Sequence, residues 1–125
     1  MNIAEYLDQM RRDIPDCSLV SFGDLRTGLS LRASAADPLR QDQLEEILQH
    51  AAFTFSVSDA LAATGETETA DGQSAIVARP QGVLIFVRSP DEPSDVICCL
   101  CRDAAAEARV VDGANKLFHG MAGGA

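Results

Sequence analysis

Cysteine is the most reactive residue type in this chain, because a thiolate serves both as a nucleophile and as a metal ligand. Three of the four cysteines, Cys98, Cys99 and Cys101, lie in one apolar run. Apolar surroundings raise the pKa of a thiol, and adjacent strand residues point to opposite faces, so only Cys99 and Cys101 share a side. Zinc knuckles also place two or more residues between their cysteines. These residues therefore predict core packing, with no catalytic cysteine, no metal site and no other cofactor.

Acidic pairs and glycine-bounded loops are the other patterns that could do chemistry. Glu45-Glu46 and Asp91-Glu92 fall on an expected helix face and in an expected loop, where solvated charge is the usual role. The chain has only two histidines, His50 and His119, and neither lies in a recognisable motif. The segment 23–28 lacks the Gly-Lys-Ser/Thr ending of a phosphate-binding loop. We therefore expect that the protein is not an enzyme.

The composition restricts the classes of partner. The chain has 125 residues, 46 % of them hydrophobic, and a formal net charge of −9. This length suits a single domain, and the ten dispersed basic residues argue against binding to nucleic acid or to an anionic membrane. No apolar run approaches the roughly 20 residues of a membrane span. The polar start is not typical of a signal peptide, so we expect a cytoplasmic protein with reduced cysteines.

Apolar periodicity and turn residues divide the first part of the chain into three elements. Apolar residues at helical spacing over 3–14 predict a helix that Pro15 ends. Two runs rich in strand-forming residues, 17–22 and 29–33, flank a glycine-bounded turn and predict a β-hairpin. In the second run apolar and polar residues alternate, so one face of that strand should contact water.

The helix expected over 41–56 has the broadest apolar stripe in the chain. Its acidic residues lie in the first turns, where the helix dipole favours them. Phe53 and several alanines widen the apolar arc beyond one packing face, so we expect this helix to contact both its own sheet and a partner. Residues 57–63 are expected to add a short second helical piece.

The remaining residues predict three strands. Residues 65–73 are acidic and contain no large apolar side chain, which is typical of a loop. The runs 74–79, 83–88 and 95–101 are joined by short connections and predict an antiparallel meander. The last two runs are apolar on both faces, so they should be central and covered by helices.

The C-terminus is expected to be a helix followed by a tail. Asp103 is placed to cap the helix. We expect one domain over 3–118 and a flexible tail over 119–125.

This order of elements resembles the roadblock/LC7 family over roughly residues 3–118. The resemblance is carried by the opening hairpin over 20–29 with its small-residue turn, the amphipathic helix over 42–56, and the hairpin over 76–87 with its Gly82. The acidic loop over 65–73 is longer than is typical of the family.

The resemblance implies an α+β fold of the profilin-like or longin-like kind, in which a five-stranded antiparallel sheet has helices on both faces. It also implies a dimer, in which the middle helix and the third strand meet their counterparts and join two sheets into one. The implied interface residues on this helix and this strand are Leu44, Leu48, Ala51, Ala52, Phe55, Ile76, Val77 and Ala78.

Bacterial relatives in the family commonly act with small Ras-like GTPases. We therefore expect a non-catalytic, homodimeric interaction module, a regulator or scaffold that acts with such a GTPase. Two alternatives stay open. One is a small acidic chaperone of the type III secretion kind, although such chaperones usually have three strands after the first helix. The other is an enzyme or ligand sensor on a profilin-like fold, which requires a pocket with convergent polar groups.

Overall fold

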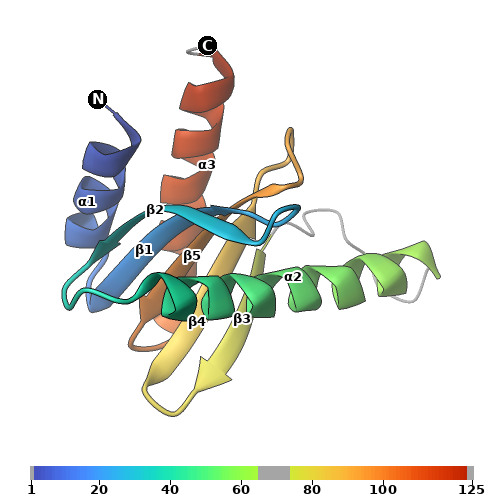
Figure 1. Cartoon of the computed structure of the whole chain (residues 1–125), viewed down its shortest axis with the longest axis horizontal. Coiled ribbons are helices and arrows are strands. Elements are labelled where there is room, and N and C mark those ends of the chain that lie inside the picture. The colour runs from blue at the N-terminus through green and yellow to red at the C-terminus, as the bar shows by residue number, and fades with distance from the viewer. Residues whose placement is uncertain (1, 65–73, 124–125) are drawn as a thin grey trace.

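The computed structural model describes residues 2–64 and 74–123, and its elements follow the expected order (Figure 1). The helices and strands, in chain order, are α1 (Ile3–Asp13), β1 (Cys17–Asp24), β2 (Leu29–Ala35), α2 (Gln41–Ala63), β3 (Ser74–Arg79), β4 (Gly82–Arg88), β5 (Asp95–Cys101), the 3-10 turn η1 (Ala104–Ala106) and α3 (Glu107–Gly123). The predicted acidic loop over 65–73 lies outside the described residues.

The five strands form one antiparallel sheet in the order β2-β1-β5-β4-β3. Strands β3, β4 and β5 are neighbours in sequence and in space, which confirms the predicted meander. The two strands that are apolar on both faces, β4 and β5, lie inside the sheet, as expected. The sheet has its edges at β2 and β3, and the predicted α+β sandwich is confirmed.

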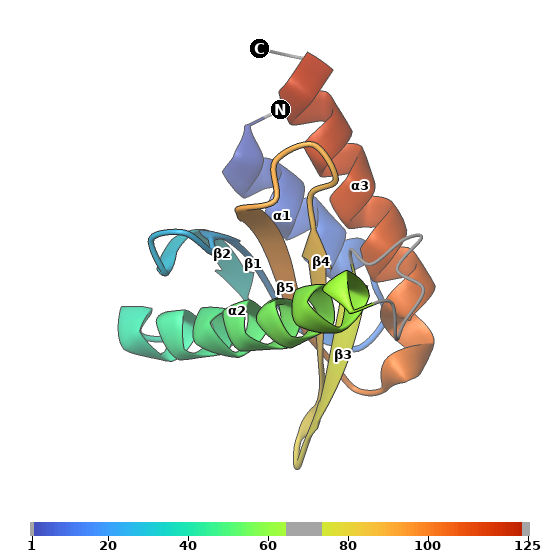
Figure 2. The same cartoon turned by 90° about the vertical axis from the view of Figure 1, so that its right-hand side faces the viewer.

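Helices cover both faces of the sheet, with α1 and α3 on one face and α2 across the other (Figure 2). The alternation of side chains along each strand creates a separate core on each face. On β1, Leu19 packs in the core beneath α2, whereas Val20 and Phe22 pack beneath α1 and α3. On β4, Leu84 and Ile85 divide in the same way between the two cores. Burial on both faces explains why β4 and β5 carry apolar side chains on both faces.

A β-bulge in the first hairpin changes which residues of β2 contact water. Phe22 pairs with Arg32, whereas Gly23 pairs with Ser30, so Leu31 is an extra residue on β2. A bulge of this kind interrupts the strict alternation of side chains between the two faces. The strand does contact water, but it exposes the apolar Leu31 and not only polar residues. Sequence alternation alone does not reveal the extra residue.

Two helices are longer than expected. Helix α2 runs without a break to Ala63, so residues 57–63 continue it and do not form a separate piece. Its 23 residues make it roughly 35 Å long, and its C-terminal turns extend beyond the sheet (Figure 1). Helix α3 continues to Gly123, past residue 119, where we expect the tail to begin. The extent of the domain stays a prediction.

The expected cap before the last helix is confirmed. The carboxylate of Asp103 accepts a hydrogen bond from the backbone N–H of Ala105 at 2.9 Å, which starts η1 and leads into α3. At the other end of the chain, the side chain of Asn2 accepts a hydrogen bond from the backbone N–H of Glu5 and caps α1. Both caps satisfy backbone donors that lack partners within a helix.

Candidate interaction surface

The structure places most of the implied interface residues of α2 inside the chain. Leu44, Leu48, Ala51 and Phe55 are buried in the core between α2 and the sheet, and Ala52 is half-buried. Their spacing follows the side of the helix that faces the sheet. These side chains hold α2 on its own sheet, so a partner would meet other residues of the same helix.

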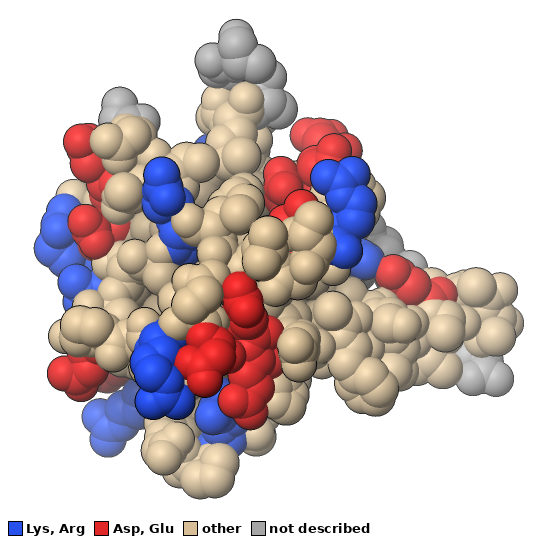
Figure 3. Space-filling model, in the orientation of Figure 1, with Lys and Arg blue, Asp and Glu red and all other residues tan. Residues whose placement is uncertain are grey.

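A second apolar stripe lies on the exposed side of α2. Phe53, Val57 and Leu61 follow one another at intervals of four residues and are 71 %, 44 % and 37 % exposed. Residues four apart lie above one another on a helix, so the three side chains line its C-terminal half. Figure 3 shows that this projecting half is mainly uncharged, whereas acidic side chains gather over the N-terminal half. Exposed apolar surface of this kind is typical of contact sites.

Strand β3 provides an open backbone edge near this stripe. It pairs with β4 on one side only, and the described residues supply no strand on its other side. Val77 packs beneath α2, whereas Ile76 and Ala78 are exposed on the other face of the strand. Figures 1 and 2 both show α2 crossing the sheet from β2 towards β3. An open edge is a template for pairing with another strand.

An ion pair holds the C-terminal half of α2 against the sheet. Arg88 of β4 donates from Nη1 and Nη2 to the carboxylate of Asp59 at 2.9 and 2.8 Å. The guanidinium carbon of Arg88 also lies 4.6 Å from the centroid of the Phe55 ring. The hydrogen bond from Arg88 lowers the pKa of Asp59, so the pair is ionised at neutral pH. Bidentate geometry fixes the relative orientation of the two groups and so helps to set the direction of the exposed stripe.

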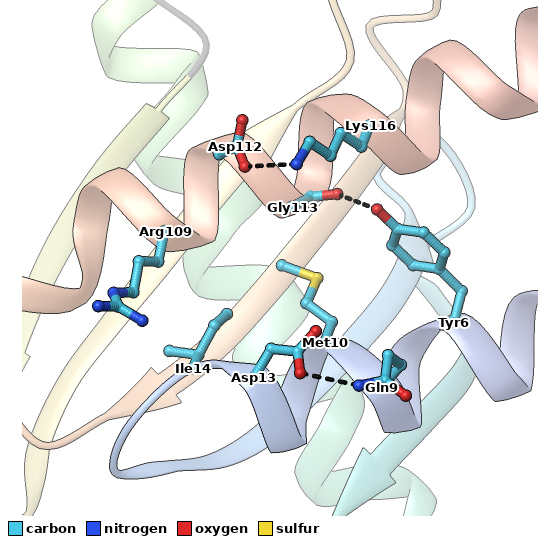
Figure 4. A pocket seen from close by; sticks show the side chains of 9 residues that line it. All are labelled: Tyr6, Gln9, Met10, Asp13, Ile14, Arg109, Asp112, Gly113 and Lys116. Atoms are coloured by element: carbon cyan, nitrogen blue, oxygen red, sulfur yellow. Dashed lines mark hydrogen bonds and ion pairs between the residues drawn. The ribbon is translucent and has the colours of Figure 1, made fainter.

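A pocket between α1 and α3 has a volume of about 320 Å³ (Figure 4). Most of its polar groups are paired with one another. Tyr6 donates its hydroxyl hydrogen to the carbonyl oxygen of Gly113 at 3.0 Å, and Lys116 pairs with Asp112 at 3.0 Å. The nine lining residues include no serine, cysteine or histidine, so the pocket contains no nucleophile–base pair of the serine–histidine or cysteine–histidine kind.

The other residues considered for chemistry lie apart from that pocket. His50 and His119 are exposed on different helices, and Glu45-Glu46 and Asp91-Glu92 lie on a helix and in a loop, as expected. In residues 2–64 and 74–123, no three side chains of histidine, cysteine, aspartate or glutamate come together as metal ligands would. In the same ranges, no helix is both long and apolar enough to cross a membrane.

Comparison with solved structures identifies the fold. Two structures of a roadblock/LC7 domain from Streptomyces avermitilis are similar to this chain, with TM-scores of 0.66 and 0.63 and sequence identities of 12 % and 16 %. Each similarity covers 95 % of this chain, and the covered shares of the two domains are 99 % and 97 %. The protein has a roadblock/LC7-type fold. Myxococcus xanthus MglB is also similar, with a TM-score of 0.66, 13 % identity and 94 % of both chains covered.

The roadblock/LC7-type fold confirms the resemblance that rests on the order of elements. No family model and no curated protein matches the sequence. Identities this low establish the fold alone, so the surface has to be understood from its own residues.

Sequence patterning missed two features of this roadblock/LC7-type fold. The four-residue spacing of Phe53, Val57 and Leu61 was available as a signal, but a wide apolar arc does not reveal which side faces the sheet. The second feature is the ion pair between Asp59 and Arg88. Asp59 lies four residues after Phe55, and this spacing places both residues on the sheet side of α2. That spacing was the available signal that Asp59 has a basic partner on the sheet.

Proposed function

We propose that this protein is a cytoplasmic interaction module without catalytic activity, and that it forms a homodimer through its α2–β3 surface. This surface comprises Phe53, Val57 and Leu61 of α2 together with the edge strand β3. The observation that carries the proposal is the exposed apolar stripe near an open strand edge. Each feature alone exposes groups that a partner would cover, and they occur at the same side of the molecule.

Two-fold symmetry suits both features. Two copies of β3 that run antiparallel would satisfy the open backbone groups of each other and join two five-stranded sheets into one. The same rotation would bring the two α2 helices together along their apolar stripes. Ile76 and Ala78 would then lie at the junction of the sheets, as the resemblance implies. The buried residues Leu44, Leu48, Ala51 and Phe55 would support the surface from beneath.

The homodimer is tested by light scattering coupled to size-exclusion chromatography, over a concentration series in the micromolar range. We expect the mass of two chains for the natural protein. Phe53→Glu should give the mass of one chain, because it places two charges at the centre of a symmetric apolar contact. Far-UV circular dichroism should show an unchanged fold, since Phe53 is exposed.

The matched control is Leu31→Glu, which also introduces a carboxylate at an exposed apolar position but lies on the opposite edge strand, β2. This variant should remain a dimer. A natural protein that is monomeric throughout the series would overturn the proposal. A Phe53→Glu variant that folds and stays dimeric would show that the dimer uses another surface.

The partner class that we propose is a small Ras-like GTPase, for which the dimer would be a regulator or scaffold. The support is the resemblance to the roadblock/LC7 family, whose bacterial members commonly act with such GTPases. Calorimetric titration of a small Ras-like GTPase from the same organism, in its GDP-bound and GTP-bound forms, should give saturable binding with different affinities for the two forms. Absence of binding in both forms would contradict this part of the proposal without affecting the dimer.

A further inference from the structure

Three of the four cysteines meet on one face of the sheet. Cys17 at the start of β1 pairs directly with Cys101 at the end of β5. Cys99 and Cys101 belong to the core beneath α1 and α3, and Cys17 packs against that core. The pairing of β1 with β5 shifts between Cys17 and Leu19, and the shift places Cys17 opposite a second thiol. Cys98 lies in the other core, beneath α2.

The strand register distinguishes one pair from the others. Residues directly opposite in antiparallel strands have Cα atoms about 4.5–5.5 Å apart, which is within the range of about 4.4–6.8 Å that a disulfide spans. Diagonal neighbours are about 7–8 Å apart, which is too far. The register therefore places Cys17 within the range of a disulfide to Cys101, whereas Cys99 is diagonal to Cys17.

The three thiols also differ in their access to solvent. Cys17 is half-buried, whereas Cys99 and Cys101 are buried. Asp16 and Arg102, which are the chain neighbours of Cys17 and Cys101, line a pocket of about 310 Å³ at this end of the sheet. A water molecule occupies about 30 Å³ in the liquid, so the pocket accommodates a molecule as small as hydrogen peroxide. The residues that line the pocket include these chain neighbours of the two thiols but neither cysteine.

The surroundings of Cys17 favour its thiolate. Hydrogen bonds from the thiols of Cys101 and Cys99 lower the pKa of Cys17 well below its usual range, and the positive charge of Arg11 adds to the effect. The Cys17 thiol can also donate to the carbonyl oxygen of Leu19 at 3.3 Å, which opposes ionisation. The same contacts, together with burial, raise the pKa values of Cys101 and Cys99 and keep both as thiols.

We propose that Cys17 and Cys101 form a peroxide-reactive thiol pair, in which Cys17 attacks and Cys101 resolves. The Cys17 sulfur forms a bond to one oxygen of hydrogen peroxide, the O–O bond breaks, and hydroxide leaves. The sulfur is oxidised to a sulfenic acid, and the peroxide is reduced. The Cys101 sulfur then displaces hydroxide from the Cys17 sulfur, and its own proton completes a water molecule. The product is an S–S bond within the chain, which a dithiol reverses.

The test exposes the full natural chain to hydrogen peroxide, blocks the remaining thiols and maps the products by mass spectrometry after trypsin. We expect the number of free thiols to fall from four to two per chain. The tryptic peptides 13–26 and 89–102 should be joined, with the loss of two hydrogen atoms, and a dithiol should separate them. A chain that keeps four thiols, or that forms only links between chains, would overturn the proposal. The readout lies within one chain, so it is independent of dimerisation.

Variants identify the resolving residue, because Cys99 and Cys101 share one tryptic peptide. Cys99→Ala should still form the link. Cys101→Ala should lose it and accumulate a sulfenic acid at Cys17, which a cyclic diketone traps. Cys17→Ser should slow thiol loss by about tenfold or more. Loss of the link in a folded Cys99→Ala variant would contradict the assignment.

If a variant does not fold, fragmentation of the linked natural peptides shows whether Cys101 or Cys99 is joined to Cys17. A bond to Cys99 would overturn the proposal.

Discussion

Gly82 begins β4 in a backbone conformation that side chains oppose. Its φ is +141°, and a Cβ atom there would overlap the carbonyl oxygen of Cys101. Gly28, in the first hairpin, has a φ of +75°, but a Cβ atom there would have nothing within 4 Å. Gly28→Ala should therefore lower the free energy of unfolding by about 1–2 kcal/mol through backbone strain alone. Gly82→Ala should lower it by more, because the backbone of β5 cannot rotate away.

Urea unfolding followed by circular dichroism measures both values for the two variants. A smaller loss for Gly82→Ala than for Gly28→Ala would mean that the strand beside Gly82 yields to a side chain, contrary to the close approach seen between β4 and β5.

The lowered pKa of Cys17 predicts an unusual dependence of its reactivity on pH. A group with a lowered pKa stays ionised down to that lower value, so Cys17 should be a thiolate across neutral pH. The rate of its alkylation by iodoacetamide should change by less than about threefold between about pH 6.5 and about pH 8.5. A thiol with an ordinary pKa of about 8.5 gains roughly 50-fold over the same interval. Glutathione is the reference compound. An alkylation rate of Cys17 that rises with pH as steeply as that of glutathione would contradict the prediction.

The packing of α2 on the sheet depends on residues that the resemblance implies for an interface. Phe55 of α2 is buried between the helix and the sheet and lies against the guanidinium group of Arg88. Phe55→Ala should lower the free energy of unfolding by about 3–5 kcal/mol, because it opens a cavity. Gln49→Ala, at an exposed position on the same helix, is the control and should change it by less than about 0.5 kcal/mol. Urea unfolding measures both values. Similar losses of unfolding free energy in the two variants would show that the Phe55 contact does not hold α2 on the sheet.

Much of the fold follows from sequence periodicity, because buried faces repeat with the period of their element. The hairpin, the meander and the central positions of β4 and β5 were all predictable in this way. The exposed stripe of Phe53, Val57 and Leu61 was not, because α2 is apolar on two sides and only contact with the sheet distinguishes them. The pairing of Cys17 with Cys101 depends on a shift in strand register, and a local pattern does not contain that information.

The whole molecule combines a net charge of −9 with a mainly uncharged projecting helix end. Two such molecules repel one another at low salt, although the proposed contact itself is apolar. Salt screens the repulsion and leaves apolar contact intact, so the dimer should tighten as sodium chloride rises from about 50 to about 500 mM. Sedimentation equilibrium at several salt concentrations measures the dissociation constant. A dimer that weakens with salt would indicate ion pairs at its centre instead.

The central claim is that the α2–β3 surface joins two copies of this chain. Amide hydrogen exchange of the β3 segment, Ser74–Arg79, tests it most directly, because an open edge exchanges faster than a paired one. At micromolar concentration the natural protein and Leu31→Glu should show slow exchange in this segment, and dilution or Phe53→Glu should accelerate it. The claim would be contradicted if the exchange rate of β3 were the same at every concentration and were also the same in a folded Phe53→Glu variant.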